Sequence, residues 1–100
     1  MLLVSKIMTR KEELIEEFER ANDNDCEYVA VAIETRGSNS WEIILNPKEN
    51  FDIKLAYYIK AYNDDLVLNT YDGIRIASVC GLPDYTTLDL LKVVLEDNEF

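Results

Sequence analysis

The segment Cys26–Arg36 (CEYVAVAIETR) constrains the fold of this 100-residue chain more than any other stretch. It is rich in β-branched residues, which favour an extended strand. From Tyr28 to Ile33 the apolar side chains occupy odd and even positions alike, so both faces of the strand must be covered. We therefore expect a strand in the interior of a sheet.

A helix is predicted before this strand. Thr9 and Glu12 have the spacing of a capping box, in which a hydroxyl and a carboxylate close the first helical turn. Apolar residues then recur at helical spacing, namely Leu14, Ile15, Phe18 and Ala21. The polar run Asn22–Asp25 ends the pattern, so we expect the helix to end there.

A hairpin and a second helix are predicted next. Gly37–Ser40 is typical of a turn, and Trp41, Ile43 and Leu45 then alternate with polar Glu42, which indicates a second strand. Asn46 is predicted to cap the following helix, because Pro47 suits the first helical position and Glu49 the third. That helix is expected to stop at Asn63–Asp65.

The rest of the chain predicts a second hairpin and a third helix. LVLNT (66–70) and IRIASVC (74–80) flank the glycine-containing turn Tyr71–Gly73. Thr86 and Asp89 then predict a cap before a C-terminal helix that runs to about Asp97. We therefore expect an α+β fold with the order α-β-β-α-β-β-α and a four-stranded, mostly antiparallel sheet of two hairpins with packed helices. We expect residues 1–100 to form one compact domain. Met8 is an alternative start, in which case residues 1–7 are an upstream extension.

The helix predicted around Phe51–Tyr62 has two unequal faces. On a helical wheel one side gathers Phe51, Leu55, Tyr58, Ile59 and Tyr62, which we expect to pack on the sheet. Ile53 and Tyr57 point the other way, one turn apart, beside Lys60. They are candidates for a small partner-binding patch. The alternative is that they are scattered apolar residues, which are normal on a protein surface.

The predicted C-terminal helix is unusually apolar. Leu90 and Val93 extend its apolar arc beyond half a turn, which leaves only a narrow polar edge. Such a helix is either sandwiched between layers or shared with another subunit. Leu90 and Val93 are therefore candidate oligomer contacts, and a homodimer is the form we expect.

The net charge of −10 falls mainly in residues 12–34, which hold nine acidic residues and one arginine. Such a surface repels phosphate backbones and anionic membranes, so we expect no direct binding to nucleic acid or to a membrane. The charge instead favours a basic protein partner.

Four of these acidic residues, Glu12, Glu16, Glu19 and Asp23, share one face of the first predicted helix, opposite its apolar side. Carboxylates four residues apart are separated by about 6 Å along a helix, a spacing that could mimic a row of phosphates. They are candidate partner-binding residues. The alternative is a solvated outer face, with Glu16 and Arg20 as a supporting pair.

Several chemistries are excluded. The chain has no histidine, which removes histidine-activated nucleophiles and mixed zinc sites. It has no nucleotide-binding glycine motif. Asp23, Asp25, Glu27 and Glu34 have calcium-loop spacing, but Tyr28 replaces the glycine that the loop requires. We expect no enzymatic activity, no cofactor and no metal.

Cys26 and Cys80 lie far apart in strand-like runs, which suits buried reduced thiols in the cytoplasm better than a secreted disulfide framework. The opening run MLLVSKI lacks the features of a signal peptide. We therefore expect a cytoplasmic protein.

The run NPKENFDIKLAYYIKAYNDDLVL, followed by YDGIRIASVCG, resembles small uncharacterised proteins encoded in prophages of Gram-positive bacteria. The resemblance covers the middle half of the chain. It implies a cytoplasmic accessory protein that acts on host machinery, and some acidic phage proteins of this size inhibit DNA-binding proteins. No functional residue transfers from it.

Together these observations predict a small acidic, non-catalytic binding protein that recognises a host protein through its first helix. Inhibition of a nucleic-acid-binding protein is one form this function could take. The alternative is a structural or assembly component that oligomerises through the apolar C-terminal helix.

Overall fold

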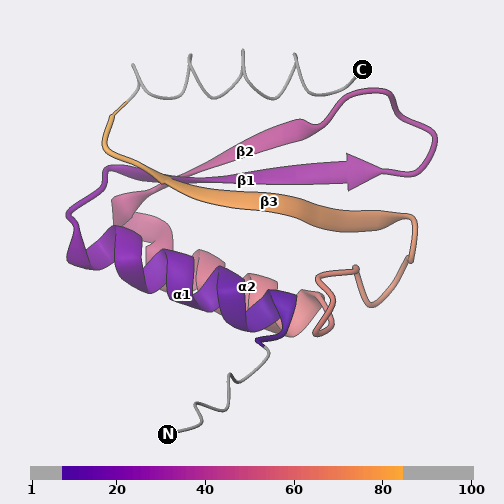
Figure 1. The fold of residues 1–100 in the computed structure, drawn as a ribbon, viewed down its shortest axis with the longest axis horizontal. Coiled ribbons are helices and arrows are strands. Elements are labelled where there is room, and N and C mark those ends of the chain that lie inside the picture. Colours follow the sequence, from indigo (N-terminus) through magenta and orange to yellow (C-terminus); the bar gives the residue numbers. More distant parts are fainter. Residues whose placement is uncertain (1–7, 85–100) are drawn as a thin grey trace, which may run out of the picture.

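The computed structural model describes residues 8–84, and in that range two helices cover one face of a three-stranded antiparallel sheet (Figure 1). The elements are α1 (Arg10–Asp23), β1 (Tyr28–Thr35), β2 (Glu42–Pro47), a short 3₁₀ helix (Lys48–Asn50), α2 (Phe51–Ala61) and β3 (Ile74–Leu82). The strand order is β2-β1-β3, so β1 is the central strand, as predicted. The α+β class is confirmed.

The prediction of a four-stranded sheet is wrong. LVLNT forms no strand, and its Val67 and Leu68 make only isolated bridges to Arg75 and Tyr62. Two backbone hydrogen bonds join the segment to β3, from the N–H of Leu68 to the carbonyl of Ile74 and from the N–H of Ile76 to the carbonyl of Leu66. After Leu68 the chain turns to the end of α2, where Asn69 donates its backbone N–H to the carbonyl of Ala61. The Asn69 side-chain amide also donates to the carbonyl of Lys60. Because Asn69 bonds carbonyls at the end of α2, the pairing with β3 is limited to Leu66–Leu68 and does not extend into a strand.

The expected C-terminal helix, with Leu90 and Val93, lies outside the described residues, and so do residues 1–7. The order α-β-β-α-β-β-α is therefore replaced, over residues 8–84, by α-β-β-α-β with the short 3₁₀ turn before α2.

Helix α1 begins and ends through local hydrogen bonds. The predicted capping box is present: the backbone N–H of Glu12 donates to Thr9 Oγ1, and the N–H of Thr9 donates to Glu12 Oε1. At the other end Asp25 adopts a left-handed φ of 57°. The N–H of Cys26 then donates to the carbonyl of Ala21, the bond that closes a Schellman motif. This turn directs the chain from α1 into β1.

The main core lies between the helices and the sheet. Phe18 of α1 meets Phe51 edge-on, with ring centroids 5.7 Å apart, and it also contacts Tyr58, at 6.1 Å. From the sheet, Val29 and Val31 of β1 complete this cluster. As predicted, the aromatic side of α2 is therefore mostly core.

The opposite face of the sheet is also apolar. Ala30 of β1 and Leu82 of β3 are buried in a second cluster, with Tyr28, Ile43, Leu45 and Cys80 partly buried around them. Because successive strand residues point to opposite faces, Ala30 and its neighbour Val31 belong to different clusters. Residues 29–33 are all buried, in agreement with a strand covered on both sides.

Asn46 does not cap α2, contrary to the sequence prediction. It belongs to β2 and is only 1% exposed. Its side-chain amide donates to the carbonyl of Val29, and its Oδ1 accepts a 3.4 Å hydrogen bond from the Tyr58 hydroxyl. Asn46 thus joins α2 to the sheet through a buried polar contact.

We expect Asn46→Ala to destabilise the protein by about 1–3 kcal/mol, because it leaves the carbonyl of Val29 and the Tyr58 hydroxyl without this partner in the core. Urea unfolding followed by circular dichroism measures the change. Asn39→Ala, at an exposed asparagine of the loop between β1 and β2, serves as the comparison. An Asn46→Ala unfolding midpoint equal to that of the unsubstituted protein would show that the buried contact contributes nothing.

Candidate functional site

The outer surface of α1 carries an acidic row, defined as Glu12, Glu16, Glu19 and Asp23. These residues lie opposite the buried positions Leu14, Phe18 and Ala21. Glu16, Glu19 and Asp23 are exposed, and Glu12 is partly exposed. The structure thus brings the four predicted residues onto one exposed face of the helix.

The members of the acidic row differ in their contacts. The Glu12 carboxylate belongs to the capping box. Glu16 forms a 2.9 Å ion pair with Arg20, which also contacts Glu17 at 2.6 Å. Within residues 8–84, Glu19 and Asp23 form no ion pair. Because the Glu16 and Arg20 side chains are both more than half exposed, their pair is weak in water and can exchange with a partner's charge.

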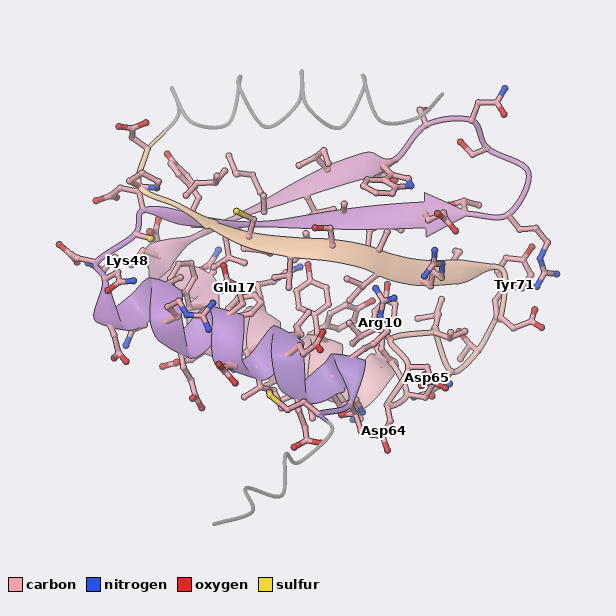
Figure 2. The ribbon with its side chains drawn as sticks, viewed as in Figure 1. Arg10, Glu17, Lys48, Asp64, Asp65 and Tyr71 are labelled. Atoms are coloured by element: carbon pink, nitrogen blue, oxygen red, sulfur yellow. The ribbon has the colours of Figure 1, made fainter. Side chains whose placement is uncertain are left out.

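The two cations at the start of α1 lie on the side of the helix that docks on its neighbours, and Arg10 remains exposed there. Arg10 donates 3.1 Å hydrogen bonds to the carbonyls of Ile76 and Ala77 in β3, and Lys11 donates to the carbonyl of Ile59 in α2. Figure 2 shows Arg10 between α1 and β3. These positive charges therefore hold α1 against its neighbours, and the acidic row faces solvent with Arg20 as its nearest cation on the helix.

A hollow of about 280 Å³ borders the acidic row between α1 and β3. It is lined by Met8, Glu13, Glu16, Glu17, Arg20 and Val79. Glu17 points toward β3 (Figure 2), where its Oε2 accepts the backbone N–H of Gly81 at 3.0 Å. Arg20 pairs with Glu16 and Glu17 in this lining, whereas Glu13 forms no ion pair within residues 8–84 and favours a cationic side chain of a partner.

The second predicted patch is also exposed. Ile53 is 71% exposed and Tyr57 is 50% exposed, on the side of α2 away from its core face. Ile59 differs from the prediction, since it is 38% exposed rather than buried. Tyr57 lies at the edge of a groove that the sequence did not indicate, because its other wall comes from Leu68–Thr70, a segment predicted as strand.

A polar cluster on the sheet, formed by Glu34, Trp41 and Arg75, was not predicted from the sequence. Glu34 of β1 receives hydrogen bonds from Arg75 of β3 and from the indole N–H of Trp41. The Arg75 guanidinium, with smaller help from Trp41, holds the pKa of the Glu34 carboxyl below its usual value of 4.5. This cluster joins neighbouring strands and has the character of a structural contact.

The Cys80 thiol is not activated as a nucleophile. Burial, with smaller contributions from Glu17 and Cys26, raises the pKa of the Cys80 thiol, which disfavours the reactive thiolate. Burial likewise raises the pKa of Tyr58 and Tyr62. Within residues 8–84 no group of three acidic or cysteine side chains could hold a metal ion. Neither described helix combines the length and apolar character required to cross a membrane.

Comparison of the chain with protein-family models, curated proteins and solved structures gives no match.

Glu34 should make stability depend on pH. Because its folded-state pKa is lowered, its contribution is present above the unfolded value of 4.5 and is lost as pH falls below that value through the folded pKa. Glu34→Gln should therefore flatten the acid limb of stability against pH, measured as urea midpoints. Glu42→Gln, an exposed change on β2, should leave that limb unchanged. Parallel acid limbs for Glu34→Gln and the unsubstituted protein would contradict this assignment.

Asp23 should reduce the stability of α1. It is the last residue of the helix, where a negative charge opposes the helix dipole. We expect Asp23→Asn to stabilise the protein by about 0.3–1 kcal/mol, measured as a higher urea midpoint at low ionic strength. The gain should shrink at high salt. A loss of stability would show that Asp23 has a structural role that its exposure does not suggest.

Proposed function

We propose that this protein is a non-catalytic binding protein that recognises a basic partner protein through the acidic row of α1. The observation that supports the proposal is the division of charge on α1. Arg10 and Lys11 donate hydrogen bonds to carbonyls of β3 and α2 on the docked side of the helix, whereas Glu16, Glu19 and Asp23 are exposed on the outer face. A helix with this arrangement presents negative potential on its free side without weakening its own docking.

Stability alone does not account for this arrangement. The helix dipole favours Glu12 and Glu13 in the first turn and Arg20 in the last, but it is opposed by Asp23 at the C-terminal end. A partner that uses the acidic row would explain why a chain keeps a charge that does not favour the helix. Proteins often retain such local costs at surfaces that serve a function.

The proposed partner is a bacterial nucleic-acid-binding protein, and the proposed effect is inhibition. The carboxylates of the acidic row follow one another at about 6 Å where they are four residues apart, so they can occupy a basic groove built for phosphates. The hollow beside Glu13 and Glu17 offers a place for an arginine or lysine of that groove. The resemblance to prophage proteins supports an accessory protein that acts on host machinery in the cytoplasm, and the free thiols of Cys26 and Cys80 agree with that compartment.

The test is a pull-down from a lysate of a Gram-positive host with the unsubstituted protein and with the double variant Glu19→Gln, Asp23→Asn. At roughly 0.5 kcal/mol for each exposed charge pair, the double variant should bind the captured partner about fivefold more weakly. Binding should also weaken as salt increases, because exposed charges are screened. The captured partner's binding to DNA or RNA should decrease when the unsubstituted protein is added.

The matched control is the double variant Glu42→Gln, Glu49→Gln, which changes the net charge equally but alters exposed residues of β2 and the 3₁₀ helix. It should bind as the unsubstituted protein does. Glu12 is kept in both variants because its change would also remove a helix cap. Equal binding by all three proteins, or binding that does not respond to salt, would refute the proposal.

A further inference from the structure

A groove of about 500 Å³ lies beside the C-terminal half of α2, away from the acidic row. It is lined by Tyr57, Lys60, Ala61, Leu68, Asn69 and Thr70. Tyr57 is half exposed at its edge, and Ile53 continues the apolar surface one turn earlier along the helix. Exposed apolar side chains beside a groove are typical of surfaces that receive another apolar group.

The walls of this groove are held in place. Asn69 donates its backbone N–H to the carbonyl of Ala61 at 2.9 Å and its side-chain amide to the carbonyl of Lys60 at 3.0 Å. Leu68 is joined to Tyr62 by a β-bridge and donates its N–H to the carbonyl of Ile74. The loop wall and the helix wall are therefore fixed relative to each other before any ligand binds, which lowers the entropy cost of binding.

The groove carries a positive charge, whereas the net charge of the chain is negative. The chain has 20 acidic residues, yet none is among the six described residues that line the groove. Lys60 is exposed and forms no ion pair within residues 8–84. Lys54 lies over the Tyr57 ring, 5.3 Å from its centroid, and adds a second positive charge beside the same aromatic side chain.

We infer that this groove binds a short acidic segment of a partner protein. An apolar side chain of the segment packs between Tyr57 and Leu68, and a neighbouring carboxylate pairs with Lys60. Lys54 holds the Tyr57 ring by a cation–π contact and strengthens the positive potential at the groove. The groove and the acidic row consist of different residues and favour partners of opposite charge. The inference about the groove therefore rests on separate observations.

An acidic peptide fits better than a nucleic acid. The net charge of −10 repels an extended phosphate backbone, whereas a peptide with one or two carboxylates can place them locally beside Lys60. The apolar walls also require an apolar side chain next to the charge.

The probe is the N-acetylated, C-amidated tripeptide Glu-Phe-Glu, titrated into the ¹⁵N-labelled full chain and followed by NMR. Amide shifts should change at Lys60, Ala61 and Leu68–Thr70. Lys60→Gln and Tyr57→Ala should each weaken binding about tenfold. Lys60→Gln alters only an exposed side chain and so tests the inference even if Tyr57→Ala disturbs the packing of Tyr57 on Tyr58.

Two variants serve as controls. Lys48→Gln removes one positive charge at the start of the 3₁₀ helix, which precedes α2 and does not line the groove. Ile59→Ala removes an exposed apolar side chain of α2 that does not line the groove. Both should bind the peptide as the unsubstituted protein does. The double variant Glu19→Gln, Asp23→Asn should also bind it normally, so failure of the acidic row and failure of this groove are distinguishable.

Three results would overturn the inference. The first is the absence of groove shifts with Glu-Phe-Glu at millimolar concentration. The second is equal binding of the matched tripeptide Lys-Phe-Lys, which would remove the charge selection. The third is the same set of shifts with inorganic phosphate alone, which would indicate a site for any anion rather than for an acidic peptide.

Discussion

The burial of β1 on both faces is the constraint on which the rest of this structure depends. Residues 29–33 are all buried, and their alternating side chains divide between the helix-covered core and the second apolar cluster. A strand of this kind is stable only with a neighbour on each edge and a cover on each face. β2 and β3 provide the two neighbouring strands, and α1 and α2 together cover one of the two faces (Figure 1).

The docking of the helices then determines which charges are free. Arg10 and Lys11 of α1 donate hydrogen bonds to carbonyls of β3 and α2, so these two cations lie on the docked side of the helix and not beside the acidic row. α2 is joined to the sheet by Tyr58 and Asn46, which turns Tyr57 and Lys60 outward. The two helices thus present surfaces of opposite charge preference while they share one aromatic core around Phe18.

Patterns decided by neighbours in sequence were predictable, and patterns decided by distant residues were not. The Thr9–Glu12 capping box and the apolar run of β1 can each be recognised from a few consecutive residues, and both are present in the structure. Asn46 before proline suits a helix cap equally well, but the distant Tyr58 and Val29 bind its side chain within the core. The acidic row follows from helical spacing alone, whereas the groove forms only because the loop at Leu68 folds back onto α2.

The contacts of Arg10 and Glu17 with β3 have a consequence for association between copies of the chain. Within residues 8–84, β3 is an edge strand, and such edges expose backbone groups that can pair with the strands of other molecules. Arg10 occupies the carbonyls of Ile76 and Ala77, and Glu17 occupies the N–H of Gly81 (Figure 2). The docked α1 therefore occupies backbone groups that could otherwise pair with another strand. A partner that displaced the helix would expose these groups of β3 and favour intermolecular strand pairing of the kind found in fibrils.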